Sequence, residues 1–178
     1  METDYTSVPY IATNIIAIVT VITAMVWPNA GRVFLSGVFI GASAFNAFTA
    51  LENPSLYLVF GDLTVSNFYR GVILGPFSKH IQFYIFTIAF FQLLIGAFLL
   101  YKDRLLKIAM IGGMVFLLAI APLGVGAAFP SSLILASALV ILLQKNIDYT
   151  IYEGPHRMPI PLKTNARLMK PGIFYSSH

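Results

Sequence analysis

The chain has 178 residues, of which 58% are hydrophobic and only 10% are charged, and its mean hydropathy is +0.82. Soluble domains carry about 25% charged residues, so this composition excludes an ordinary soluble domain and predicts an integral membrane protein of four or five helical spans. The sequence contains no cysteine, which excludes disulfides, thiolate metal sites and thiol redox chemistry. The net charge of +4 lies mainly at the ends of apolar runs, as in membrane proteins, so we do not expect a nucleic-acid partner.

Two apolar runs open the chain. The first, residues 8–27, follows an acidic segment that lacks the cationic region of a cleaved signal peptide, so we expect a permanent span. Residues 29–32 are then expected to turn the chain back into a second span over residues 33–51. This second span carries Gly37 and Gly41 at GxxxG spacing within a stripe of small residues, which predicts a packing face between helices.

A long connection follows, over residues 52–79. It is too polar and too interrupted by Pro and Gly to be a clean span, yet too apolar to lie free in water. Residues 56–60 and 68–74 are expected to form short amphipathic or re-entrant pieces that lie on the bilayer surface or cap the bundle.

The second half of the membrane region is predicted to be a hairpin of two spans, residues 80–101 and 107–128, followed by a short span over residues 132–144. The hairpin turn is basic, and short loops rich in Lys and Arg stay on the cytoplasmic side. We therefore expect the N-terminus outside and the C-terminus in the cytoplasm. The inner side then receives Arg32, Lys102, Arg104, Lys107, Lys145, Arg157, Lys163, Arg167 and Lys170, whereas the outer side receives only Arg70 and Lys79.

The tail, residues 145–178, is polar and rich in proline, with no helical period. We expect it to be extended and to dock on the cytoplasmic face of a partner subunit. Its expected interaction residues are Arg157, Arg167, Phe174 and Tyr175.

No Asp, Glu, Lys or Arg lies between the ends of the predicted spans, which argues against a pump or a proton-coupled transporter. The polar residues in the spans include Asn46, Gln82 and Gln92. They either form hydrogen bonds between helices or orient a quinone or lipid in a crevice of the bundle. No residues have the spacing of a nucleophile with its base or of a metal site, so we predict no catalytic residue, no metal and no cofactor bound by this chain alone.

Five polar residues are expected to converge on the outer mouth of the bundle: Glu52, Asp62, Arg70, Lys79 and His80. In one interpretation Arg70 pairs with Asp62 or Glu52 and ties the connection to the helices. In the other, the cluster binds an anionic head group or forms a docking surface.

Residues 32–144 resemble the DoxX-like family of membrane proteins. The likeness rests on Gln92 to Gly96, which match that family's apolar segment ending in Ile-Gly, on Lys102 to Leu106, which match its basic turn, and on its opening helix over Arg32 to Asn46. The resemblance implies a four-helix bundle, with the first span here as an addition. Relatives include a membrane subunit attributed to thiosulfate:quinone oxidoreductase or terminal quinol oxidase, whose cysteine-containing outer motif has no counterpart here.

These observations predict an all-α integral membrane protein: a four-helix transmembrane bundle plus an extra N-terminal helix over residues 1–144, then the extended tail. The favoured function is a non-catalytic accessory subunit that packs and stabilises partner helices of a larger membrane complex and contacts lipids. The family likeness points to a respiratory, quinone-linked complex. The alternatives are a quinone-interacting oxidoreductase subunit that acts through the outer cluster, and a small transporter or channel.

Overall fold

The computed structural model describes residues 8–127 and 129–145, and this part of the chain contains helices and turns but no strand. Three segments are long and apolar enough to cross a membrane, namely Pro28–Glu52, Ile81–Phe98 and Asp103–Gly124. The predicted all-α architecture is therefore confirmed for the described residues, and three of the predicted spans correspond to helices that could cross a membrane. The five long helices are α1 (Val8–Val26), α2 (Pro28–Glu52), α5 (Ile81–Phe98), α6 (Asp103–Ile120) and α7 (Ser131–Gln144).

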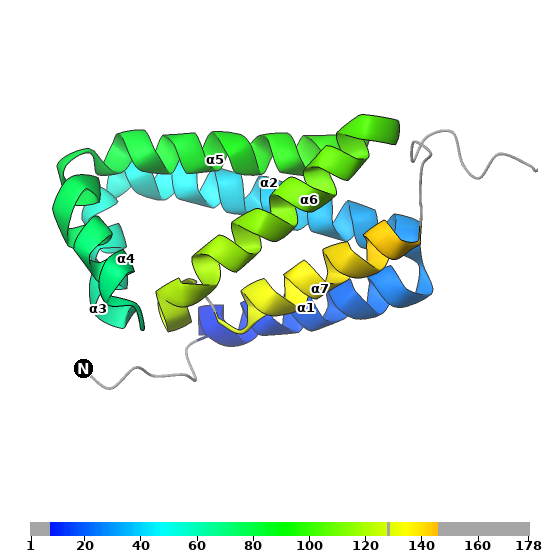
Figure 1. The fold of residues 1–178 in the computed structure, drawn as a ribbon, viewed down its shortest axis with the longest axis horizontal. Coiled ribbons are helices and arrows are strands. Elements are labelled where there is room, and N and C mark those ends of the chain that lie inside the picture. The colour runs from blue at the N-terminus through cyan, green and yellow to red at the C-terminus, as the bar shows by residue number, and fades with distance from the viewer. Residues whose placement is uncertain (1–7, 128, 146–178) are drawn as a thin grey trace, which may run out of the picture.

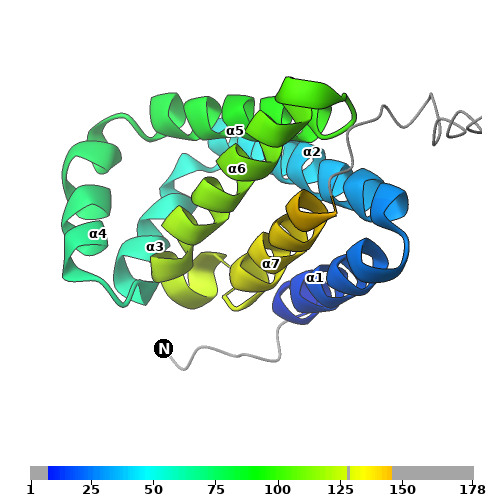
Figure 2. The same cartoon turned by 45° about the vertical axis from the view of Figure 1, so that its right-hand side comes forward.

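The long helices form two pairs joined by a crossing helix. Helix α2 packs along α5, α1 packs along α7, and α6 runs diagonally between the two pairs (Figure 1). The same arrangement is visible after rotation in Figure 2. Fully buried apolar side chains from several helices fill the centre, among them Leu35, Leu106, Leu139 and Leu142. Hydrophobic side chains elsewhere on the long helices point outward, as expected for surfaces that face lipid.

Helix α2 begins at Pro28, five residues before the predicted start of the second span. The predicted turn over residues 29–32 is wrong, because Trp27 alone separates α1 from α2. Proline suits the first turn of a helix, where its missing N–H costs no intrahelical hydrogen bond. The sharp reversal brings Gly31 against Ala24, where a Cβ on Gly31 would lie 2.5 Å from the Ala24 Cα.

Helices α2 and α5 approach closely through a different set of small residues from the one that the sequence predicts. A Cβ on Gly96 would lie 3.0 Å from the backbone oxygen of Ser36. The Ser36 hydroxyl donates to the Gly96 carbonyl at 2.7 Å, and the Ser43 hydroxyl donates to the Ala89 carbonyl at 2.6 Å. Gly37 and Gly41, by contrast, have no atom within 4 Å of an added Cβ. The predicted GxxxG face therefore points out of the bundle.

Short helices close one end of the bundle, at the left of Figure 1. They are η1 (Pro54–Leu58), α3 (Val59–Leu63), α4 (Asn67–Val72) and η2 (Ile73–Phe77), which agrees with the short pieces predicted for the connection. Two hydroxyl groups hold this cap on the end of α6 and on the turn η3 (Ala121–Ala127). Thr64 Oγ1 donates to the Pro122 carbonyl at 2.7 Å, and the Tyr69 hydroxyl donates to the Ala119 carbonyl at 2.6 Å.

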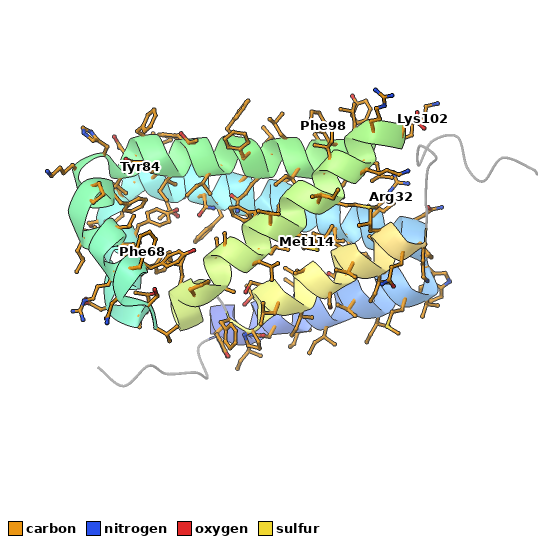
Figure 3. All side chains as sticks on the ribbon, in the orientation of Figure 1. Arg32, Phe68, Tyr84, Phe98, Lys102 and Met114 are labelled. Carbon is orange, nitrogen blue, oxygen red and sulfur yellow. The ribbon has the colours of Figure 1, made fainter. Side chains whose placement is uncertain are left out.

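Most of the basic residues in the described part of the chain lie at the opposite end, whereas Arg70 and Lys79 lie at the capped end. Figure 3 shows Arg32 and Lys102 together at this end, with Phe68 and Tyr84 at the capped end. Lys145, just after α7, donates to the carbonyl of Met25 near the end of α1. The predicted tail contacts through Arg157, Arg167, Phe174 and Tyr175 lie outside the described residues.

Candidate functional site

Asn46 and Gln92, two of the three predicted crevice residues, contact each other between α2 and α5. Asn46 Nδ2 donates to Gln92 Oε1 at 2.7 Å, and the Tyr57 hydroxyl donates to Asn46 Oδ1 at 2.9 Å. Tyr57 is 6% exposed and reaches this position from η1 in the cap. The sequence indicates Tyr57 only as an interfacial aromatic residue, because nothing in its spacing reveals that the cap folds back toward Asn46.

The Tyr57 contact leads to a pH-dependent prediction. Burial raises the pKa of Tyr57 above its ordinary value near 10, and a hydrogen bond with Thr49 partly opposes this. A raised pKa means that the folded protein favours the neutral phenol. The stability that Tyr57 contributes is therefore fully present below about pH 10, declines above it, and is lost as the pH rises through the folded-state pKa.

We expect Tyr57→Phe to lower the free energy of unfolding by about 1 kcal/mol at pH 8, since it removes one hydrogen bond. The difference from wild type should shrink as the pH rises above about 10. Thermal unfolding of both proteins in detergent from pH 8 to 11 measures this. A difference that stays constant over that range would contradict the assignment.

Gln82, the third predicted crevice residue, does not join the other two. Its Nε2 donates to the Ala50 carbonyl at 3.1 Å, and its side chain is exposed. Gln82 instead lines an open surface hollow together with Lys79 and His80. Asn46, Gln82 and Gln92 all form hydrogen bonds between α2 and α5, as one of the two interpretations predicts, but Gln82 lines a different space from Gln92. Gln82 lies in the first turn of α5, whereas Gln92 lies three turns deeper along the helix.

The predicted outer cluster also divides. Arg70 and Asp62 form an ion pair of 3.3 Å, but both side chains are more than half exposed, and they join α4 to α3 within the cap. Lys79 and His80 lie at the surface hollow instead. Within residues 8–127 and 129–145, no salt bridge involves Glu52. An exposed pair of this kind contributes about 0–1 kcal/mol, so Thr64 and Tyr69, not Arg70, tie the cap to the long helices.

Arg32 is the main departure from the expectation that the spans hold no charge. Arg32 belongs to α2, and its side chain is 0% exposed. Nε and Nη2 both donate to the Leu99 carbonyl, at 3.2 and 3.1 Å, and Nη2 also donates to the Tyr101 carbonyl. Arg32 therefore caps the C-terminal end of α5, where free carbonyls and the helix dipole favour a cation.

A cavity of about 120 Å³ lies between α2, α5, α6 and α7. Its wall is mostly apolar, with Phe39 and Phe116 among the lining residues, and its polar lining comes from Gln92, Ser131 and Ser132. Ser132 is 2% exposed, and its Oγ has no hydrogen-bond partner in the described part of the chain. A serine before an apolar run is a common N-cap, but the N-cap of α7 is Pro130, and both serines lie inside its first turn.

In the described ranges, no three His, Asp or Glu side chains gather in a way that could hold a metal ion. What the arrangement offers is hydrogen bonding: a buried amide pair, a buried arginine at a helix end, and a small cavity with a free hydroxyl. Compared with known proteins, the chain matches no family model, no curated protein and no solved structure.

Proposed function

We propose that this protein is a non-catalytic accessory subunit of a larger membrane complex and that it binds a transmembrane helix of another polypeptide through the outer face of α2. The observation that carries the proposal is the outward direction of the small-residue stripe. Gly37, Gly41 and Ala44 are all exposed, and no atom lies within 4 Å of a Cβ built on either glycine.

The shape of this face supports a helix as the partner. Three exposed aromatic side chains lie on or beside the stripe: Phe34 is 49% exposed, Phe45 is 68% exposed and Phe48 is 64% exposed. Small residues let helix backbones approach closely in a membrane, where packing and not the hydrophobic effect drives association. By their spacing on α2, Phe34 and Phe45 would lie on one side of a helix that packs on the stripe, and Phe48 continues the stripe by one turn.

The polar residues between the helices support packing as the role of the bundle. Asn46 bonds to Gln92, and Ser36 and Ser43 bond to carbonyls of α5. Such bonds between membrane helices are worth roughly 0.6–2 kcal/mol each, so they stabilise the α2–α5 pair. These hydrogen bonds occupy the side-chain amide of Asn46 and the hydroxyls of Ser36 and Ser43, groups that a catalytic site would need to direct at a substrate.

The same proposal includes five spans with the N-terminus outside and the C-terminus in the cytoplasm. The accumulation of cations at the end that holds Arg32 and Lys102 supports this orientation. Helix α7 has 14 residues, or about 21 Å, and would cross a hydrocarbon layer of about 30 Å only with its flanking residues included. The DoxX-like resemblance extends the proposal to a respiratory, quinone-linked complex, in which a quinone or lipid could lie near the subunit interface.

Leucine substitutions on the stripe test the proposal. Gly37→Leu combined with Gly41→Leu should leave the bundle folded, because both side chains enter open space. The bulkier side chains should reduce the partner recovered on mild detergent purification by at least about tenfold, which corresponds to 1.4 kcal/mol. Quantitative mass spectrometry of the purified complex gives this ratio.

Gly112→Leu is the matched control, because Gly112 lies on α6 and an added Cβ there also meets nothing within 4 Å. It should leave the partner ratio unchanged. A wild-type protein that purifies alone as a stable monomer would overturn the proposal, as would a partner ratio that the double variant does not alter. Because the chain has no cysteine, Ala44→Cys also allows disulfide cross-linking, which would reveal a second copy of the chain by its mass.

A further inference from the structure

We infer that the cavity between α2, α5, α6 and α7 is a binding site for the carbonyl group of a neutral, largely apolar molecule. The inference goes beyond packing, because a helix on the outer face of α2 would not fill this space. It depends on an unpartnered buried hydroxyl, a buried amide and the first turn of α7 beside one small volume, and on the absence of any charged side chain among the described residues that line it.

The first donor is Ser132. Its Oγ is buried and makes no hydrogen bond to any described residue, although it lines the cavity. A buried hydroxyl without a partner is costly, since it has lost its water and gained nothing in exchange. A ligand oxygen in the cavity would supply the missing partner.

The second donor is the amide of Gln92, which is 5% exposed and also lines the cavity. Its Oε1 accepts from Asn46, which is itself oriented by Tyr57. These hydrogen bonds hold the Gln92 amide in place through its Oε1, and its Nε2 is the donor on the other side of the amide. Ser132 therefore supplies a buried hydroxyl without a partner, and Gln92 adds a second polar group to the same wall.

The third contribution comes from α7, whose first turn holds Ser131 and Ser132. The helix dipole places partial positive charge at this first turn. All three features favour an oxygen with partial negative charge. The apolar walls, which include Phe39, Phe116 and Leu135, exclude an ion and suit a hydrocarbon body.

The size of the cavity limits the group that can enter. One water molecule needs about 10–15 Å³ of such space, so about 120 Å³ accepts several waters or one small head group. A lipid ester and a free ketone share the required chemistry, because each presents a carbonyl oxygen on an apolar body. The experiment must therefore separate these two sources and distinguish both from water.

Acetophenone is a suitable probe, and ethylbenzene is its control because it has a similar shape and no carbonyl. In the purified full-length protein, acetophenone should raise the melting temperature more than ethylbenzene does at equal concentration. Ser132→Val should weaken the apparent affinity for acetophenone about fivefold, as expected for the loss of one hydrogen bond and of space. Ser137→Val should leave it unchanged, because Ser137 is exposed on the same helix and donates to the Ile134 carbonyl.

Native mass spectrometry after delipidation separates the two sources. A phospholipid that wild type retains, and that acetophenone displaces, identifies a lipid carbonyl; stabilisation by acetophenone with no retained phospholipid identifies a free carbonyl compound. If Ser132→Val does not fold, Ser132→Ala removes the hydroxyl without adding volume. Equal effects of acetophenone and ethylbenzene on wild type would show that the carbonyl is not recognised and would overturn the inference, as would no effect of either probe, which is expected if the cavity holds only water. So would a Ser132 variant that folds and keeps full affinity.

Discussion

Replacing Arg32 with methionine is expected to lower the free energy of unfolding by about 2–4 kcal/mol. Hydrogen bonds from a charged donor are worth about 1.5–3 kcal/mol, and this side chain forms at least three to the end of α5 while fully buried. Methionine fills much of the volume, so the loss reflects mainly the carbonyls of Leu99 and Tyr101 that are left without their donor. Chemical unfolding in detergent micelles measures the difference.

Two further variants separate the hydrogen bonds from the charge. Arg104→Met makes the same substitution at an exposed position in the first turn of α6, and we expect a change within about 0.5 kcal/mol. Arg32→Lys keeps the positive charge but cannot offer the same fork of donors, so it should remain clearly destabilised. If Arg32→Lys were as stable as wild type, the charge alone would explain the role of Arg32. Equal losses for Arg32→Met and Arg104→Met would contradict the assigned contacts.

Gly31→Ala is expected to cost about 1–3 kcal/mol or more, although it adds a single methyl group. The new Cβ would lie 2.5 Å from the Cα and 2.8 Å from the backbone nitrogen of Ala24. Both are backbone atoms, so no side-chain rotation relieves the overlap, and overpacking of this kind costs about 1–3 kcal/mol. Trp27 is the whole connection between α1 and α2, so the two helices cannot separate locally without moving along their lengths.

Gly37→Ala is the matched control for this substitution. It makes the same change in the same helix, but nothing lies within 4 Å of the new Cβ. Alanine forms helices more readily than glycine by up to about 1 kcal/mol, so we expect Gly37→Ala to be neutral or slightly stabilising. Unfolding free energies of the two variants in the same detergent decide the matter. A small effect at both positions would mean that α1 and α2 can shift apart at little cost.

The contrast between Gly31 and Gly37 shows what sequence reasoning could and could not predict at the start of α2. The segment Asn29–Ala30–Gly31–Arg32 has the composition of a turn, so the sequence alone predicts a turn there. The helix nevertheless begins at Pro28, because Gly31 fits against Ala24 and Arg32 finds acceptors on α5. Residue 99 lies far away in the sequence, so no local pattern reveals that partner.

The outer polar residues illustrate the same limit. Charge and position in the sequence predict one cluster from Glu52 to His80. In the fold, Asp62 pairs with Arg70 inside the cap, whereas Lys79 and His80 line a separate surface hollow. The apolar pieces of the connection indicate where its short helices form. How those helices fold back over the bundle depends on contacts such as Tyr69 with Ala119, which join residues about fifty positions apart.

By itself, the sequence determined that this is a helical membrane protein, approximately where its long helices lie, and that its basic turn joins two of them. These properties follow from local hydropathy, because each apolar run must satisfy its own backbone hydrogen bonds in a membrane. Only the tertiary structure decided that Arg32 is buried, that Gly37 and Gly41 face outward, and that Ser132 and Gln92 share a cavity. Those properties depend on the rotation of each helix about its axis, which is set by packing between distant segments.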